Sequence, residues 1–308
     1  MTPLRVRSFP RLFSTTIVLA RCLTTMAAQP TIPAATIVGT DTYVYNADLT
    51  VTDYTFRVPL DYSAANSSAG PQINIFARGV RKTASPAAAA DTPYFLWLQG
   101  GPGFEVSAPQ DNAVTAFLTE KSFQVLYLDQ RGTGLSSAIT AETLALVSKD
   151  PKEQAEYLTH FRAPQIVQDA EAIRKALIGS EKWGVFGQSF GGFTALTYLS
   201  FYPAGLREVF ATGGMAPITA PGPDDVYKRL YKQVEARNAV FFKKYPGDAE
   251  RIQKIVAHLT KNPQELPSGG TLTVNRFREL GILFGGHGGL DSLHRMYPTS
   301  HPKYAGAD

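Results

Sequence analysis

The sequence has little cysteine and no long hydrophobic run. Cys22 is the one cysteine among 308 residues, so no internal disulfide is possible and no thiolate cluster is available for zinc or iron–sulfur chemistry. No uninterrupted run of about 18 apolar residues occurs, which is the length that a membrane-spanning helix needs. We therefore expect no disulfide scaffold, no membrane span, and no metal or other cofactor.

The remaining composition is ordinary for a globular protein. Hydrophobic residues make up 44% of the chain and charged residues 18%, which argues against wholesale disorder. A chain of this length indicates one large domain or two small ones, and it is long enough to bury a substantial core.

The net charge of +4 belongs to the N-terminus. Residues 1–40 hold four arginines and no acidic residue, whereas the remainder carries 26 basic and 26 acidic residues. A neutral body offers no basic groove for phosphates, so we expect no nucleic-acid binding. Residues 1–30 have the Arg-rich, acid-free composition of an organelle transit peptide, which predicts a mitochondrial location. The alternative is a disordered leader, with translation starting at Met26 and a cytoplasmic protein.

The body begins with antiparallel strands and continues with alternating strands and helices. Runs of β-branched and aromatic residues bounded by turn residues indicate the first strands, and near-continuous apolar runs indicate strands buried on both faces. The expected strands are 42–46, 53–60, 72–80, 94–98, 123–128, 184–186 and 209–212, and the expected helices are 164–178 and 193–201. This alternation predicts an α/β fold with a doubly wound sheet.

Beyond Pro217 the alternation stops. Helices are expected at 224–245, 249–259 and 275–284, a loop at 261–270, and a tail without strands from Gly285. We therefore divide the chain into a leader at 1–30, a sheet core at 40–217 and a helical region at 218–308.

The strongest chemical motif is a G-x-S-x-G sequence at 187–191. It follows a buried strand and opens a helix, the context in which a sharp turn exposes the Ser189 hydroxyl as a nucleophile. The alternative is a tight turn with an incidental serine.

A serine nucleophile needs donors for the oxyanion that forms on the attacked carbonyl. The backbone N–H of Phe190, directly after the serine, would be one donor. The second is expected from the glycine-rich loop at 99–103, where we favour the N–H of Gly101, with Gly100 as second choice. A plain strand-ending turn is the alternative for this loop.

A third loop, DQRGTGLS at 129–136, follows another buried strand. A carboxylate and a guanidinium two residues apart in a glycine turn can hold loop backbone rigid by hydrogen bonds. We therefore expect Asp129 and Arg131 to be structural.

Together these loops resemble those of the proline iminopeptidases, also called prolyl aminopeptidases, which are α/β-hydrolase serine peptidases. The similar stretches are VPLDY at 58–62, QGGPGFE at 99–105, DQRGTGLS at 129–136, QDAEAIRKAL at 168–177, GQSFGG at 187–192 and GG at 213–214. The resemblance runs from about Val51 to the C-terminus, and it implies an α/β-hydrolase fold in which residues 218–308 form a helical cap. Gln99 departs from the pattern, since many members have His there, and we interpret it as the mark of a subgroup.

The resemblance implies removal of an N-terminal residue, preferentially proline, from peptides with a free N-terminus. Such an enzyme must bind a cationic amine, which requires a carboxylate in the pocket. Glu105, directly after the glycine-rich loop, is the best candidate for this role. Acids of the helical region (Asp224, Asp225 and Glu235) are weaker candidates.

The rest of a catalytic triad is not evident. In this fold an acid and then a histidine follow the serine in chain order, after later strands, yet residues 214–308 contain no convincing buried strand. The histidines beyond Ser189 are His258, His287, His294 and His301. An Asp291–His294 pair has the wrong spacing for this fold.

We therefore expect the triad Asp and His to be missing from this chain. The chain is then expected to be truncated and inactive by itself, and strand 209–212 is expected to have an unpaired edge. Two alternatives stay open. One is an esterase or other acyl hydrolase of the same fold, and the other is a non-catalytic remnant.

Overall fold

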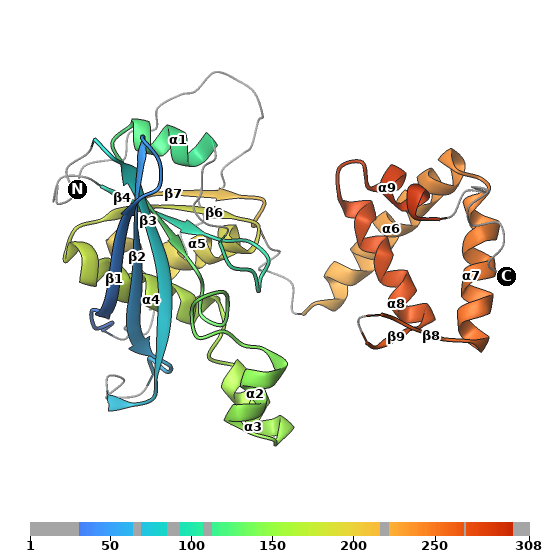
Figure 1. The fold of residues 1–308 in the computed structure, drawn as a ribbon, viewed down its shortest axis with the longest axis horizontal. Coiled ribbons are helices and arrows are strands. Elements are labelled where there is room, and N and C mark those ends of the chain that lie inside the picture. The colour runs from blue at the N-terminus through green and yellow to red at the C-terminus, as the bar shows by residue number, and fades with distance from the viewer. Residues whose placement is uncertain are drawn as a thin grey trace. The chain divides into compact units, whose positions relative to one another are not determined.

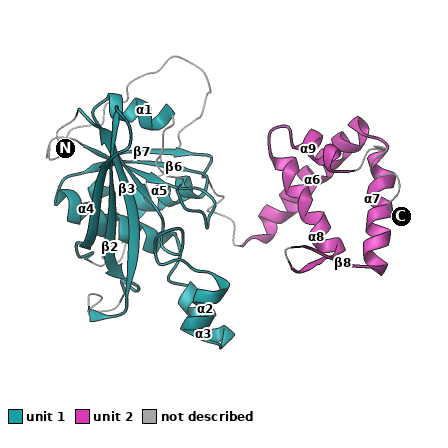
Figure 2. Cartoon of the chain, in the orientation of Figure 1, with its two compact units in different colours: residues 1–216 teal, residues 217–308 magenta. Residues whose placement is uncertain are grey.

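A computed structural model describes residues 31–63, 69–84, 93–106, 113–215, 222–267 and 269–297. The chain divides into two compact units, Met1–Ala216 and Pro217–Asp308, which Figure 2 colours separately. The expected targeting leader at 1–30, Cys22 and His301 lie outside the described residues.

The first unit is built on a seven-stranded mixed sheet with the order β1-β2-β3-β5-β4-β6-β7 (Figure 1). Three long antiparallel strands come first: β1 (Thr36–Val44), β2 (Leu49–Pro59) and β3 (Gln72–Lys82). The shorter strands β4 (Tyr94–Leu98), β5 (Gln124–Leu128), β6 (Trp183–Gln188) and β7 (Leu206–Thr212) run parallel to one another. The junction between the two parts is the antiparallel pair β3–β5. This mixed sheet with flanking helices confirms the predicted α/β class.

The two faces of the sheet carry separate cores, because successive side chains of a strand point to opposite faces. One face packs against helices α4 (Ala163–Ile178) and α5 (Phe190–Phe201), and its buried members include Leu96, Leu98, Leu126, Leu128, Ala170 and Ala195. The other face packs against α1 (Ala113–Glu120), with Phe95, Val125, Tyr127 and Leu118 among its buried members.

The sequence missed three short helices and misplaced one strand. Helices α2 (Ala141–Val147) and α3 (Pro151–Leu158) bury no residue, so they carry no apolar stripe for a periodicity argument to detect. Helix α1, with 8 residues, is also short. Strand β1 begins at Thr36, not at residue 42, and all of its positions are exposed. Without a buried face it lacks the alternation that marks a strand.

Strand β7 ends the sheet. Among the described strands its one neighbour is β6, so the expectation of an unpaired edge is confirmed for this part of the chain. Phe210 on β7 is 47% exposed, which leaves apolar surface uncovered beside that edge.

The second unit is mainly helical. It contains α6 (Asp224–Lys244), α7 (Asp248–Lys261), α8 (Val274–Arg278), a 3₁₀ segment Glu279–Gly285 and α9 (Gly289–Met296), with a small hairpin of β8 (Gln264–Glu265) and β9 (Thr271–Leu272). Its core gathers Phe241, Leu290, Leu293 and Tyr297. None of the helices in the described ranges is long and apolar enough to cross a membrane.

Two expectations for this unit need correction. The expected loop at 261–270 contains β8, and the expected helix at 275–284 is α8 followed by the 3₁₀ segment. The tail from Gly285, for which no strand was expected, holds α9. Helix α9 has 8 residues and lies in a stretch rich in Gly and His, so its buried Leu290 and Leu293 were too few to indicate a helix.

Candidate active site

Ser189 occupies a turn between strand β6 and helix α5. Its backbone has φ 57° and ψ −122°, a left-handed conformation that costs a residue with a Cβ atom free energy. The N–H of Ser189 donates to the carbonyl of Thr212 at 2.8 Å, so β7 holds the turn in place. The serine is half-buried, and its side chain makes no capping hydrogen bond to α5. The structure thus places Ser189 on the sharp strand–turn–helix that the motif predicted.

Helix α5 starts in unusually close contact with the sheet. A Cβ atom at Gly191 would lie 1.9 Å from the carbonyl oxygen of Leu98, at the end of β4. Only glycine allows this approach, and it brings the first turn of α5 beside the loop that follows β4. Phe190 is the first residue of α5, so its N–H has no acceptor within the helix.

The glycine-rich loop at 99–103 lies against the serine turn. A Cβ atom at Gly100 would lie 3.1 Å from Cβ of Ser189 and 2.8 Å from Oε1 of Gln188. The structure therefore brings Gly100 to Ser189, as the sequence predicted for this loop. Gly101, the favoured donor, comes next in the loop with φ 117°.

Gln99, the residue that departs from the family pattern, is tied to two neighbours. Its Oε1 accepts a hydrogen bond from the indole N–H of Trp97 at 3.1 Å, and its carbonyl accepts one from Nε2 of Gln130 at 2.9 Å. The second bond joins the loop after β4 to the loop after β5.

Asp129 holds loop backbone, as expected. Its Oδ1 accepts from the N–H of Val106 at 2.8 Å, and its Oδ2 accepts from the N–H of Leu135 at 2.9 Å. Burial raises the pKa of this carboxyl, although both backbone N–H groups favour its charged form. These contacts confirm the structural interpretation of Asp129.

Arg131 is buried, and its hydrogen bonds connect three of the sequence motifs. Its Nε and Nη2 lie 2.7 and 2.6 Å from the two carboxylate oxygens of Asp169 in α4. It also donates to the carbonyls of Pro59, Leu60 and His160, and the hydroxyl of Tyr62 completes the cluster with a bond to Asp169 at 2.9 Å. Arg131 is therefore structural, as predicted.

The role of Asp169 was not predicted from the sequence. Asp169 lies three residues after Ile166 and four before Ile173, so its position in the sequence already placed it on the apolar face of α4. A carboxylate on a buried helix face requires a charged partner.

Glu105 stands at the end of the glycine-rich loop and is exposed. A Cβ atom at Gly134 would lie 2.5 Å from Cβ of Glu105, so the loops after β4 and β5 meet here. Its negative charge adds to the effect of burial in raising the pKa of Asp129. Within the described part of the chain, no salt bridge neutralises Glu105. Its carboxylate stays available for a cationic ligand, and amine binding stays a prediction.

The histidines described beyond Ser189 belong to the second unit. Nδ1 of His294 lies 2.8 Å from Oδ2 of Asp248, and its ring stacks on Tyr245 with centroids 3.8 Å apart. Asp291 instead accepts from the Tyr245 hydroxyl at 2.5 Å. An Asp291–His294 pair, already considered unsuitable from its spacing, is not formed. His258 lies near Gln264 on the surface.

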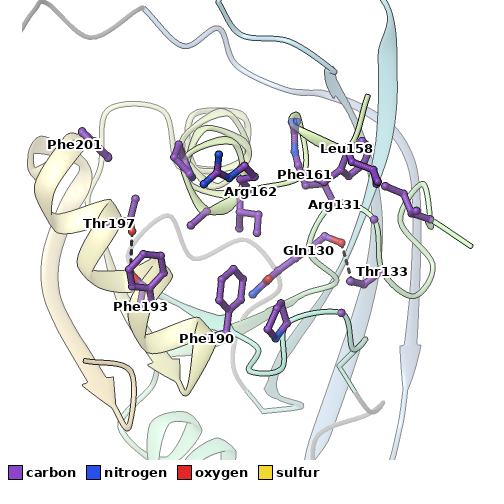
Figure 3. Close-up of a pocket in the computed structure, with 17 residues that line it drawn as sticks. Gln130, Arg131, Thr133, Leu158, Phe161, Arg162, Phe190, Phe193, Thr197 and Phe201 are labelled. Carbon is purple, nitrogen blue, oxygen red and sulfur yellow. Dashed lines mark hydrogen bonds between the residues drawn. The ribbon is translucent and has the colours of Figure 1, made fainter. Parts of the chain in front are cut away.

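A cavity of about 680 Å³ opens beside Phe190 in the first unit (Figure 3). Pro102 and Gly103 from the glycine-rich loop and Gln130 to Thr133 from the next loop form part of its wall. The rest is largely apolar and includes Ile139, Leu158, Phe161, Ile166, Phe193 and Phe201. This cavity was not predictable from the sequence, because its wall combines residues from separate elements. Among the residues that the structure describes, no group of three or more His, Cys, Asp or Glu side chains is placed to hold a metal ion.

Comparison with known proteins shows where this architecture recurs. The chain is 39% identical over 274 residues to a proline iminopeptidase of Aspergillus aculeatus, covering 87% of this chain and 60% of the relative. It is 40% identical over 241 residues to a proline iminopeptidase of Aeromonas sobria, covering 78% of this chain and 55% of the relative. The chain thus spans a little over half the length of these two relatives, and the resemblance to proline iminopeptidases is confirmed.

A solved structure of proline iminopeptidase from Mycobacterium smegmatis is also similar, at 18% identity and a TM-score of 0.38, covering 74% of this chain and 66% of that one. Residues 93–258, more than half of the chain, match the family described as having the alpha/beta hydrolase fold. The matched segment contains the parallel strands, the serine turn and the glycine-rich loop. The chain therefore belongs to the α/β-hydrolase family.

Proposed function

We propose that this chain is the nucleophile-bearing part of a serine aminopeptidase that releases N-terminal proline, or another N-terminal residue, from peptides. The observation that carries the proposal is the position of Ser189, on a left-handed turn with Gly100 against it. The names of the two similar proline iminopeptidases supply the substrate class.

In the proposed reaction, Oγ of Ser189 attacks the carbonyl carbon of the first residue. The N–H groups of Phe190 and Gly101 stabilise the oxyanion that forms there. The C–N bond breaks, the amine of the shortened peptide leaves with a proton, and an acyl-enzyme remains on Ser189. Water then hydrolyses that ester and regenerates the hydroxyl.

The base that takes the serine proton is not assigned to His258 or His294. His294 faces Asp248 and Tyr245, and His258 faces Gln264, which are structural contacts within the helical unit. We propose that residues 1–308 alone have no appreciable peptidase activity, since a serine hydroxyl without a base is a weak nucleophile.

The test compares protein purified from the cells that make it with a recombinant 31–308 chain, which keeps strand β1 whole, on a proline arylamide. Activity is expected from the first preparation and not from the second. Equal activity of both would contradict the proposed absence of a base and would direct attention to His287, His294 and His301.

A second experiment tests the nucleophile and the substrate class in the native preparation, meaning protein purified from the cells that make it, with each variant introduced into their gene. A serine-directed phosphonate is expected to label Ser189, and Ser189→Ala is expected to lower turnover by roughly 10⁶-fold. Ser200→Ala is the matched control, because Ser200 lies on the exposed side of α5 and bonds only the carbonyl of Leu196. Labelling of another serine would overturn the assignment, and equal hydrolysis of N-blocked amides or simple esters would favour a general acyl hydrolase.

We also infer mitochondrial targeting from the acid-free, Arg-rich composition of residues 1–30. A fluorescent protein fused after residue 40 is expected in mitochondria. Diffuse fluorescence would favour the cytoplasmic alternative, with a start at Met26.

A further inference from the structure

We propose that the cavity beside Phe190 binds the residue that follows the scissile bond, and that it selects an apolar residue with a free C-terminal carboxylate. This inference rests on the proposed function and extends it, because it predicts a preference for short peptides whose second residue is the last.

The position of the cavity supports a substrate subsite. Phe190 contributes its backbone N–H to the proposed oxyanion hole and its ring to the cavity wall (Figure 3). Pro102 and Gly103, directly after Gly101, contribute to the same wall. The cavity therefore lies next to the residues of the proposed oxyanion hole, and its volume is in the range of sites for small ligands.

Charge decides which side of the scissile bond the cavity serves. The N-terminal residue of a substrate carries a cationic amine, whereas the residue after the bond carries the carboxylate of a dipeptide. The charged residues of the described wall are Arg131 and Arg162. Arg131 is neutralised by Asp169, but no described carboxylate forms a salt bridge with Arg162. A carboxylate fits beside Arg162, since a guanidinium can bind it with two parallel hydrogen bonds, and an ammonium group does not.

Gln130 supplies a hydrogen-bond acceptor inside the cavity. Its side chain extends toward Phe190 (Figure 3) and is part of the wall. The residue is 4% exposed, and Nε2 is used by the carbonyl of Gln99. No described group donates to its Oε1. An amide oxygen accepts hydrogen bonds, so an amide N–H of the bound residue would find an acceptor in this Oε1.

The remaining wall suits an apolar side chain. Phe161, Phe193 and Phe201 line it together with Leu158 and Ile139. Burying an aromatic or aliphatic side chain against these residues is favoured by the hydrophobic effect. The three requirements (an apolar side chain, an amide N–H and a carboxylate) are met by one C-terminal apolar amino acid residue.

A binding experiment tests the subsite without catalysis. N-acetyl-L-phenylalanine has all three groups, and N-acetyl-L-phenylalaninamide lacks only the carboxylate. The 308-residue chain is expected to bind the acid roughly tenfold or more tightly than the amide, measured by titration calorimetry, because a charge-assisted hydrogen bond is lost with the amide. Equal affinity for the two, or no binding of either, would overturn the proposal.

Variants connect that preference to the cavity. Arg162→Gln is expected to bind acid and amide alike, and Thr197→Phe, which places a ring in the cavity, is expected to weaken both. Arg57→Gln removes an exposed arginine on β2 outside the cavity and is expected to keep the wild-type preference. Thermal unfolding by circular dichroism identifies any variant that fails to fold. A folded Arg162→Gln that keeps the tenfold preference would contradict the assignment.

Kinetics with the native preparation separates this inference from the proposed function. Prolyl-phenylalanine is expected to be cleaved with a higher kcat/KM than prolyl-phenylalaninamide, and Arg162→Gln is expected to remove that difference while sparing proline methyl ester. If wild-type protein cleaves none of these substrates, the aminopeptidase proposal fails, and the binding experiment still decides the subsite. If Arg162→Gln lowers all three rates equally, the subsite proposal fails and the aminopeptidase proposal stands.

Discussion

Arg131 and Asp169 form a buried ion pair in which Nη2 lies 2.6 Å from Oδ1, with both side chains at most 1% exposed. Asp169 belongs to α4 and Arg131 to the loop after β5, so the pair fixes that loop onto the helix layer. Further bonds from Arg131 reach the end of β2. This cluster helps to hold the loop that contributes Gln130 to the cavity, together with the bonds of Asp129 and Gln99.

We predict that Arg131→Met destabilises the first unit by about 3–5 kcal/mol, because it leaves the Asp169 carboxylate buried without its partner. Urea unfolding measures the change. Arg57→Met is the control, since Arg57 is exposed on β2 and substitutions of exposed residues usually change stability by about 0.5 kcal/mol or less. The double variant Arg131→Met/Asp169→Leu is expected to recover part of the loss, and an unchanged midpoint for the single variant would show that the pair does not stabilise the fold.

We predict that Gly191→Ala destabilises the first unit strongly and that Gly100→Ala lowers activity more than stability. The new methyl group at position 191 meets the carbonyl oxygen of Leu98 at 1.9 Å, whereas at position 100 it meets Ser189 and Gln188 at 2.8–3.1 Å. Gly39→Ala is the control, because its nearest atoms are 3.8 Å away. Wild-type turnover on proline arylamide and a wild-type melting temperature for Gly100→Ala would refute the close packing of this loop on the serine turn.

We predict that Ser189→Gly unfolds at a higher temperature than Ser189→Ala. Both variants remove the hydroxyl, but only glycine adopts φ 57° and ψ −122° without a steric penalty, which is on the order of 1 kcal/mol or more at such a position. Differential scanning calorimetry compares the two variants directly. Equal stability would mean that the turn relaxes when the hydroxyl is absent.

We predict that Glu105→Gln raises KM, or lowers kcat/KM, for proline arylamides in the native preparation and spares simple esters that lack the amine. Glu105 is exposed next to the glycine-rich loop, where its carboxylate can meet a cationic substrate. Glu120→Gln, at the exposed end of α1, is the matched control. Equal losses on both substrate types would assign Glu105 to loop support.

The pattern of apolar residues along the chain was sufficient to predict the parallel strands and the two helices around the site. Strands β4 and β5 are apolar on both faces, and α4 shows a buried stripe, so the sequence carries their signal. The exposed β1 and the helices α2 and α3 carry no such signal. The positions of these three elements depend on contacts with other parts of the fold, which the pattern of apolar residues along the chain does not reveal.

The sequence by itself determined the α/β class, the turn that presents Ser189 and the glycine-rich loop beside it, because each depends on residues adjacent in the chain. Only the tertiary structure decided that Arg131 pairs with Asp169, that His294 faces Asp248 and that Phe190, Gln130 and Arg162 share one cavity. These contacts join residues that are 28 to 60 positions apart in the chain. Such long-range partners are brought together only when whole helices and loops pack onto the sheet.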